Sequence, residues 1–271
     1  MTSRILYSFF ILMLSGMLLE AVQALSKGDN NGVPPTAAPM NIIVIGGSSG
    51  MGKAAAIACV QRGGKVMIVS RSSEKLAKAA EEIQSHAPSS HSDEEDLVVE
   101  TATLDATDEE AVEKFVMERL TTTQATTSNL VDSAAKKWDG LVVSAAGKAP
   151  HGPLTTLPTA STRDLFESKF WSAYHCAKHI GPILRSGGGV VFVAGVLNRR
   201  PGMNCAPLAT TNGALEGLTR ALALEWGPNL RVNCLVSIVF CGRDMQYEKL
   251  LVFLSNNQNC NLKNGYDLGM R

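Results

Sequence analysis

The chain has few aromatic residues and no excess charge of either sign. Aromatic residues make up 6% of its 271 residues, and 25 Lys and Arg balance 25 Asp and Glu. Electrostatic capture of nucleic acid needs a basic face, so the balanced charge argues against a nucleic-acid partner. Hydrophobic residues still make up 45% of the chain, which is normal for a globular core and excludes a disordered or collagen-like protein.

Cysteine is also scarce, and no two cysteines form a CxxC pair. This excludes a disulfide scaffold and argues against a zinc ribbon. His175 and His179 are four residues apart, a spacing that can hold a metal, but no third ligand follows at a recognisable spacing and no HExxH motif occurs. We therefore expect no metal site, and we interpret the cysteines mostly as small core residues.

Apolar residues form one conspicuous run near the start of the chain. Arg4 is the only charge before the run Ile5–Leu19, and the small-residue stretch Ala21–Ala24 follows it. This order is typical of a signal or targeting peptide, predicted here over residues 1–24 with a polar linker over 25–39. An uncleaved membrane anchor and a buried helix are the alternatives. A leader implies the secretory pathway or an organelle reached through it, with membrane contact only if the leader stays uncleaved.

From Met40 onward the pattern alternates between strands and helices. Asn41–Ile45 contains four consecutive β-branched residues, as expected for a strand buried on both faces. Further strands are predicted over Lys65–Ser70, Leu97–Leu104, Gly140–Ala145, Gly189–Ala194 and Arg231–Val236. Helices are predicted over Gly50–Gln61, Ser73–Gln84, Asp108–Leu120, Arg163–Leu184 and Asn204–Glu225. The alternation predicts an α/β fold, a three-layer doubly wound parallel sheet of the Rossmann type over residues 40–237.

A glycine-rich turn follows the first strand directly. Such a turn must bend sharply and let a phosphate approach the backbone, and residues without a Cβ permit both. The next helix would direct its free N–H groups at the pyrophosphate of a dinucleotide. The residues expected to bind the cofactor in this turn are Gly46, Ser48, Ser49, Gly50, Met51 and Gly52.

Several motifs, taken together, resemble those of the short-chain dehydrogenase/reductase family. The spacing Gly-x-x-x-Gly-x-Gly is similar to the family's TGxxxGxG pattern, Leu104–Asp108 to its LDVTD, and Ser144–Gly147 to its NNAG. Gly213–Ala223 and Arg231–Asn233 resemble its last helix and sixth strand. The resemblance covers about Asn41 to Ser237.

The resemblance implies an oxidoreductase that transfers hydride between a nicotinamide dinucleotide and a small carbonyl or alcohol. It places Asp105 at the adenine, and Ala146 and Gly147 beside the cofactor. It also implies a homo-oligomer formed through the two long helices.

The end of the second strand indicates which dinucleotide is preferred. Members of the family that prefer NAD carry an acid there, hydrogen-bonded to the ribose diol. Here Ser70, Arg71 and Ser72 offer a guanidinium and two hydroxyls instead. Because the guanidinium fork suits a phosphate, the sequence predicts NADP(H). The alternative is that Arg71 is a solvated residue at the entry of a helix.

The catalytic pattern of the family does not recur in this chain. The resemblance implies an Asn-Ser-Tyr-Lys tetrad, in which the Tyr exchanges a proton with the substrate. Counted back from Gly213, Leu208 stands at the Tyr position and Asn212 at the Lys position, while Val193–Val196 offers no hydroxyl at the Ser position. Lys169 stands at the Asn position.

Lys and Asn have thus exchanged positions relative to the family's tetrad. Two hypotheses follow from this exchange. In the first, Lys169 and Asn212 line one pocket, and Lys169 holds the nicotinamide ribose or acts as an acid whose pKa burial has lowered. In the second, the chain is a catalytically inactive NADP(H)-binding pseudoenzyme that acts as a sensor or partner subunit.

The end of the chain departs from the family. After Ser237 the family continues with Pro-Gly, a helix that covers the substrate and a seventh strand, whereas this chain ends in an unrelated Asn-rich stretch. We therefore predict a divergent tail over residues 238–271 and no seventh strand. The substrate cannot be identified from the sequence, because its pocket depends mostly on this tail.

Overall fold

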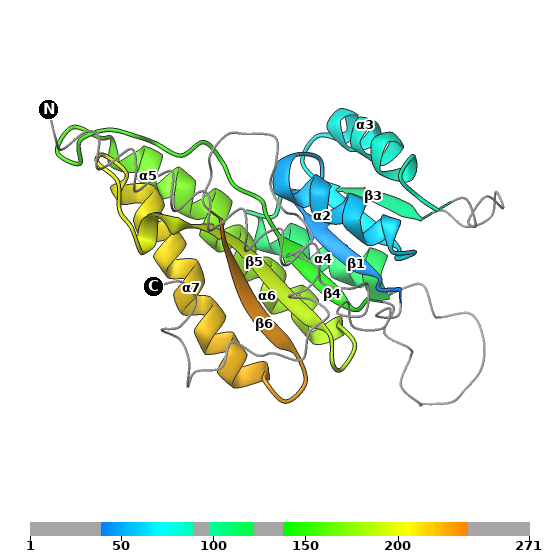
Figure 1. Cartoon of the computed structure of the whole chain (residues 1–271). Helices are drawn as coiled ribbons and strands as arrows, with labels where there is room; N and C mark the ends of the chain where they lie inside the picture. The colour runs from blue at the N-terminus through cyan, green and yellow to red at the C-terminus, as the bar shows by residue number, and fades with distance from the viewer. Residues whose placement is uncertain (1–38, 89–97, 122–137, 238–271) are drawn as a thin grey trace, which may run out of the picture. The chain divides into compact units, whose positions relative to one another are not determined.

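The computed structural model describes residues 39–88, 98–121 and 138–237. Its centre is one parallel sheet of six strands in the order β3-β2-β1-β4-β5-β6 (Figure 1). The strands are β1 (Ile42–Ile45), β2 (Val66–Ser70), β3 (Val99–Thr103), β4 (Gly140–Val143), β5 (Gly189–Gly195) and β6 (Arg231–Ser237). The predicted leader over 1–24, all but the last residue of the linker over 25–39, and the tail over 238–271 lie outside the described residues.

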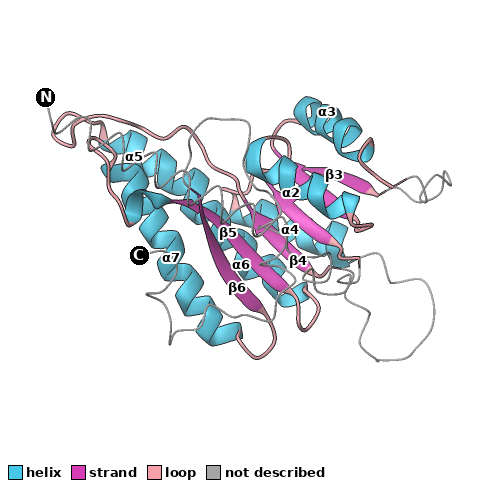
Figure 2. Ribbon diagram, viewed as in Figure 1, coloured by secondary structure: helices cyan, strands magenta, loops and turns pink. Residues whose placement is uncertain are grey.

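Helices cover both faces of the sheet (Figure 2). One face packs against α2 (Gly50–Gln61) and α3 (Ser73–Gln84). The other packs against α4 (Glu109–Phe115), α6 (Ser172–Ile180) and α7 (Ala206–Trp226), while α5 (Thr159–Phe166) packs against α7. This arrangement confirms the predicted three-layer doubly wound fold. None of the helices within the described ranges combines the length and apolar character needed to cross a membrane.

The first strand shows why its sequence is apolar at every position. Ile43 and Ile45 contribute to the core beneath α4, α6 and α7, whereas Ile42 and Val44 contribute to the core beneath α2 and α3. Side chains alternate between the two faces of a strand, so a strand with helices on both sides buries all of its residues. All four are at most 2% exposed.

The predicted long helix Arg163–Leu184 differs from the structure in two ways. In the structure it begins at Thr159 rather than Arg163, directly after Pro158, whose extended backbone precedes the first turn. A π-helical turn over Glu167–Trp171 then separates α5 from α6. The predicted helix Asp108–Leu120 likewise turns π-helical from Val116 to Thr121. Isolated π-helical turns occur frequently at functional sites, and the one between α5 and α6 contains Lys169.

Candidate functional site

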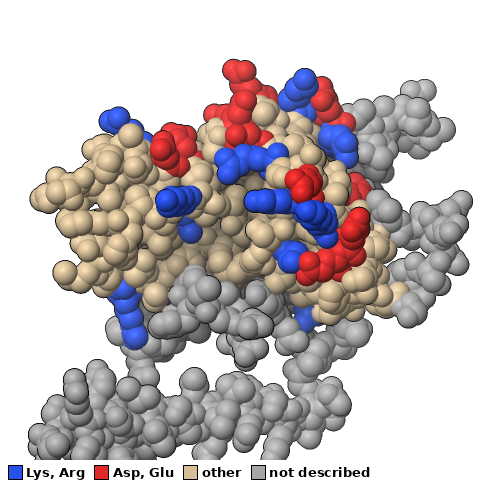
Figure 3. Space-filling model, turned by 90° about the horizontal axis from the view of Figure 1, so that it is seen from above, with Lys and Arg blue, Asp and Glu red and all other residues tan. Residues whose placement is uncertain are grey.

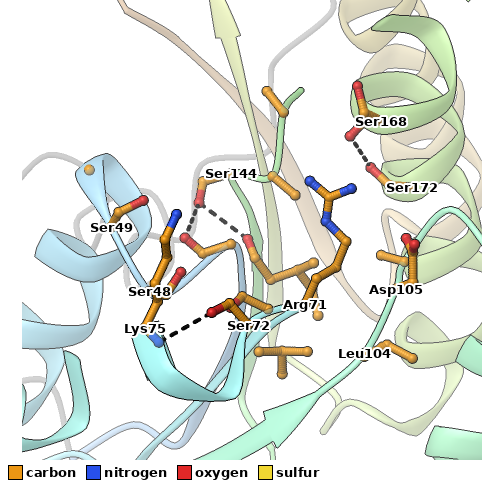
Figure 4. A pocket seen from close by; sticks show the side chains of 18 of the residues that line it. Ser48, Ser49, Arg71, Ser72, Lys75, Leu104, Asp105, Ser144, Ser168 and Ser172 are labelled. Carbon is orange, nitrogen blue, oxygen red and sulfur yellow. Dashed lines mark hydrogen bonds between the residues drawn. The ribbon is translucent and has the colours of Figure 1, made fainter. Parts of the chain in front are cut away.

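A cleft of about 430 Å³ opens where β1, β2, β3 and β4 end (Figure 4). In doubly wound sheets, ligands bind outside the carboxyl ends of the strands, where the strand order reverses. Here the reversal lies between β1 and β4. The residues predicted to bind a cofactor that line this cleft are Gly46, Ser48, Ser49, Gly50, Met51, Arg71, Ser72, Asp105 and Ala146. Gly52 and Gly147 pack directly behind this lining.

The glycine turn has no space for side chains at Gly46, Gly47 and Gly52. Gly46 has a positive φ of 83°, and a Cβ there would lie 2.7 Å from the backbone nitrogen of Ala145. A Cβ on Gly52 would overlap the carbonyl oxygen of Gly46 and the hydroxyl of Ser144. The absence of side chains therefore lets the turn pack tightly against the end of β4.

The start of α2 is suited to an anion. Its first turn contains no acidic residue, and the N-cap residue Ser49 makes no side-chain capping hydrogen bond. The first N–H groups of a helix have no partner within the helix, and they carry the positive end of its dipole. The glycine turn and the helix start thus form a cradle that fits a pyrophosphate.

Ser144 connects this cradle to the centre of the sheet. Its hydroxyl lies within hydrogen-bond distance of two carbonyl oxygens, that of Ile45 at 3.2 Å and that of Gly46 at 3.3 Å. The residue stands at the first position of the NNAG-like motif. It therefore fixes the first residue of the glycine turn against the end of β4.

Basic and hydroxyl side chains gather at the end of β2. Arg71 extends into the cleft from that strand end, and Lys75 from the first turn of α3 (Figure 4). Ser72 caps α3, its hydroxyl accepting a hydrogen bond from the Lys75 N–H at 3.3 Å. Lys75 was not predicted as a cofactor-binding residue, although its place in the first turn of the helix that Ser72 caps puts it near Arg71 in the sequence.

A free hydroxyl lies in the same corner of the cleft. Ser70 lines the cleft, and its buried hydroxyl oxygen has no hydrogen-bond partner among the described residues. Within the described part of the chain, neither Arg71 nor Lys75 forms an ion pair. Because buried polar groups are normally hydrogen-bonded, this corner fits a ligand that carries acceptor oxygens.

Asp105, which follows β3, supplies a negative charge to the cleft. Partial burial acts to raise its pKa, but hydrogen bonds from the Thr107 N–H at 3.1 Å and the Thr107 hydroxyl at 2.8 Å outweigh it. The nearby Arg71 charge adds to this effect, so the pKa of Asp105 lies below its usual value. The carboxylate is therefore ionised and held in one orientation at the edge of the cleft.

Neither of the two catalytic candidates lines the cleft. Lys169 is half-buried in the π-helical turn, where burial lowers the pKa of its ammonium group and the neighbouring Cys234 thiol opposes that shift. Asn212 is fully buried on α7, and neither atom of its amide has a hydrogen-bond partner among the described residues. The π-helical turn and α7 are in contact, but no hydrogen bond joins these two side chains in the described structure.

The remaining positions compared with the family tetrad also lie near α7. Leu208 is half-buried in the first turns of that helix. Val193–Val196 forms the end of β5 and the start of a short 3-10 turn. Cys234, which neighbours Lys169, lies on β6, where burial raises its pKa to about 12.

The two histidines of α6 lie beside a carboxylate of α4. Glu109 accepts a hydrogen bond from the Lys178 ammonium at 2.6 Å, and its carboxylate lies 3.2 Å from His179 Nε2 and 3.7 Å from His175 Nε2. The hydrogen bond from Lys178, followed by that from His179, lowers the pKa of Glu109 to about 2. Among the residues that the structure describes, no group of three His, Cys, Asp or Glu could hold a metal ion.

Charges of both signs are interspersed on the face seen in Figure 3. Two pairs from the α2 and α3 region illustrate the pattern. Lys53 lies 2.6 Å from a carboxylate oxygen of Glu82, and Lys78 lies 2.7 Å from one of Glu74. Exposed pairs of this kind contribute little to stability, at roughly 0–1 kcal/mol each.

A doubly wound sheet whose first turn cradles a phosphate defines the class of dinucleotide-binding proteins. A family model described as "Enoyl-(Acyl carrier protein) reductase" matches residues 46–240. The chain belongs to the short-chain dehydrogenase/reductase family of oxidoreductases, whose members bind a nicotinamide dinucleotide. This result confirms the family resemblance on which the sequence analysis depended.

Individual relatives agree with this assignment. The chain is 28% identical over 208 residues to a short-chain dehydrogenase/reductase of Stachybotrys chlorohalonatus, with 73% of each chain covered. It is 28% identical over 199 residues to an oxidoreductase of Mycobacterium tuberculosis, covering 71% of this chain and 66% of the relative. A solved NADPH-bound short-chain oxidoreductase of Pseudomonas aeruginosa shares the fold, with a TM-score of 0.63 and 20% identity over 81% of this chain and 78% of that one.

Proposed function

We propose that this protein is an NADP(H)-dependent oxidoreductase with a non-standard active site. It would transfer hydride between the nicotinamide ring and a small carbonyl or alcohol substrate. The observation that carries the proposal is the corner at the end of β2, where Arg71 lines the cleft and no carboxylate immediately follows the strand.

The preference for NADP(H) over NAD(H) follows from the groups in this corner. A ribose 2′-phosphate would meet the guanidinium of Arg71, the ammonium of Lys75 and the hydroxyl of Ser70. Guanidinium groups bind phosphate through two parallel hydrogen bonds, which are stronger than bonds between neutral groups. A free ribose diol would find no carboxylate acceptor immediately after β2, so NAD(H) would lack its usual partner.

The other residues of the cleft have positioning roles in this proposal. The glycine turn and the start of α2 bind the pyrophosphate, while Asp105 bounds the adenine side. The bound cofactor supplies the hydride chemistry itself. The protein's part is to hold the cofactor across the sheet and to provide a proton donor or acceptor for the substrate oxygen.

Lys169 is the group that we propose for this proton transfer. Leu208 has no exchangeable proton, whereas the amine of Lys169 has one, and burial lowers its pKa and so favours release of that proton. The Pseudomonas aeruginosa relative is described as containing an atypical catalytic center together with NADPH. That description supports the idea that a protein of this fold can bind NADPH beside a catalytic centre that departs from the usual one.

Two measurements test the proposed function in order. Fluorescence titration of the purified chain should show binding of NADPH at least about tenfold tighter than that of NADH, equivalent to roughly 1.4 kcal/mol. Oxidation of NADPH should then be followed at 340 nm with a panel of aldehydes, ketones and quinones. Equal affinity for the two dinucleotides would refute the NADP preference, and binding without turnover would indicate the inactive pseudoenzyme instead.

The location of the protein is a separate proposal. The predicted leader over residues 1–24 would direct it into the secretory pathway or an organelle reached through it. Fusing residues 1–40 to a fluorescent reporter tests this, because a reporter that remains diffuse in the cytosol would contradict the prediction.

A further inference from the structure

Ser168 connects two parts of the site that the sequence motifs treat separately. It lies in the π-helical turn between α5 and α6 and lines the cleft. Its hydroxyl accepts a hydrogen bond from the Gly147 N–H at 3.0 Å and lies 3.3 Å from the carbonyl oxygen of Leu165, to which it donates. The loop that follows β4 is therefore attached to the turn that carries Lys169.

The two backbones approach closely enough to exclude any side chain between them. A Cβ on Gly147 would lie 2.5 Å from the Ser168 hydroxyl and 3.0 Å from the Ser168 Cβ. The Ser172 hydroxyl, which also lines the cleft, donates to the Ser168 carbonyl at 2.8 Å (Figure 4). These contacts fix the position of Ser168 from both the loop and the helix.

The same loop also touches the glycine turn. A Cβ on Gly46 would lie 2.7 Å from the Ala145 nitrogen, so the turn and the loop are already in close contact. Close contacts thus run from the pyrophosphate cradle through Ala145 and Gly147 to Ser168. Replacing Ser168 would therefore alter the packing of this loop against the glycine turn that lines the cleft.

We propose that Ser168 is a positioning residue for the nicotinamide half of the dinucleotide. The proposal rests on the proposed function and adds a role that no motif of the family resemblance contains. In a doubly wound sheet the two halves of a dinucleotide lie on opposite sides of the point where strand order reverses. Arg71 and Asp105 occupy the side of β2 and β3, so the nicotinamide half lies over the loop that Ser168 holds.

The test compares two ligands in the wild type and in Ser168→Ala. NADPH has both halves, whereas adenosine 2′,5′-bisphosphate has only the half that Arg71 and Asp105 face. Loss of one neutral hydrogen bond should weaken NADPH binding by about two- to tenfold, and the bisphosphate should bind as before. Ser161→Ala is the matched control, since it removes a hydroxyl from α5 at a position that does not line the cleft.

A second measurement examines the contact itself in the free protein. Hydrogen exchange of the Gly147 amide should be faster in Ser168→Ala than in the wild type, because the amide loses its acceptor. Equal weakening of both ligands, or unchanged NADPH affinity in Ser168→Ala, would overturn the proposal. A wild type that binds neither ligand would instead refute the proposed function, so the two failures can be told apart.

Discussion

The hydroxyl of Ser144 occupies the space where a Cβ on Gly52 would lie. The carbonyl oxygen of Gly46 borders the same space, and a backbone atom cannot turn aside as a flexible side chain can. We therefore expect Gly52→Ala to displace the glycine turn from the end of β4. NADPH affinity should fall at least about tenfold, and the free energy of unfolding should fall by about 1–3 kcal/mol, as overpacking usually costs. Titration and urea unfolding check both, and wild-type affinity would contradict the close packing described here.

Gly217 offers the contrasting case within the same chain. It lies in the middle of α7, where a Cβ would meet no atom within 4 Å. Gly217→Ala should raise the free energy of unfolding by about 0.5–1 kcal/mol, since alanine loses less backbone entropy on forming a helix. For a domain of this size the midpoint of thermal unfolding should rise by about 1–4 °C. A lowered midpoint in differential scanning calorimetry would show that this part of α7 is more crowded than the structure indicates.

The charge of Arg71 should decide between the two dinucleotides. Arg71→Glu places a carboxylate where a ribose 2′-phosphate would lie, so we expect NADPH affinity to fall by about tenfold or more. NADH has no 2′-phosphate and should bind at least as tightly as before. Arg62→Glu makes the same charge change at the exposed end of α2, away from the cleft, and serves as the control. Full NADPH affinity in Arg71→Glu, measured by fluorescence titration, would refute the proposed NADP preference.

Glu109 should make stability depend on acid pH. Its folded-state pKa of about 2 lies below the ordinary 4.5, so the folded state binds fewer protons than the unfolded state between these values. The contribution of Glu109 is therefore fully present above about pH 4.5 and is lost as pH falls toward 2. Glu109→Gln should be less stable than the wild type at neutral pH, with the difference vanishing near pH 2. Urea unfolding across pH 2 to 7 measures this, and a difference that stays constant with pH would exclude the ionic contribution.

The local sequence predicted the central strands well, because a strand that is buried on both faces is apolar at consecutive positions. The run Ile42–Ile45 is apolar throughout, and the structure buries all four side chains. The glycine turn was predicted for the same kind of reason, since Gly46 and Gly52 have no room for a Cβ. Arg71 was predicted to bind the cofactor from its charge at the end of the second strand, and Asp105 from the family resemblance, and both line the cleft.

Features that depend on distant contacts could not be predicted in this way. The π-helical turn around Lys169 leaves no compositional mark, because it changes only the pattern of backbone hydrogen bonds. The bond between Gly147 and Ser168 joins a loop to a helix that is separate in sequence. The contact of Glu109 with the α6 histidines likewise requires α4 and α6 to pack side by side, which the helix spacing alone does not specify.

Lys169 provides a test in which stability and function should change in opposite directions. Burial lowers the pKa of its ammonium group, so the charged form is less favourable in the folded state than in the unfolded state. Lys169→Met keeps an unbranched side chain of similar length without the charge, so it should be more stable than the wild type at pH 7. The unfolded chain binds more protons than the folded chain between the lowered pKa and 10.5, so wild-type stability rises with pH there. The advantage of the variant should therefore shrink as pH approaches 10.5.

Urea unfolding of both proteins between pH 6 and 10 measures this difference in the free energy of unfolding. Lys148→Met is the control, because Lys148 is exposed and its replacement removes no buried charge. If Lys169 transfers the proton in the proposed reaction, the same variant should lose NADPH turnover while keeping NADPH affinity. A residue that lowers stability but supports catalysis is common at active sites, because a charge held out of water is reactive for the same reason that it is unfavourable. Lys169→Met with higher stability and undiminished turnover would show that the buried charge has no part in the reaction, and the proton donor would then have to be sought elsewhere in the chain.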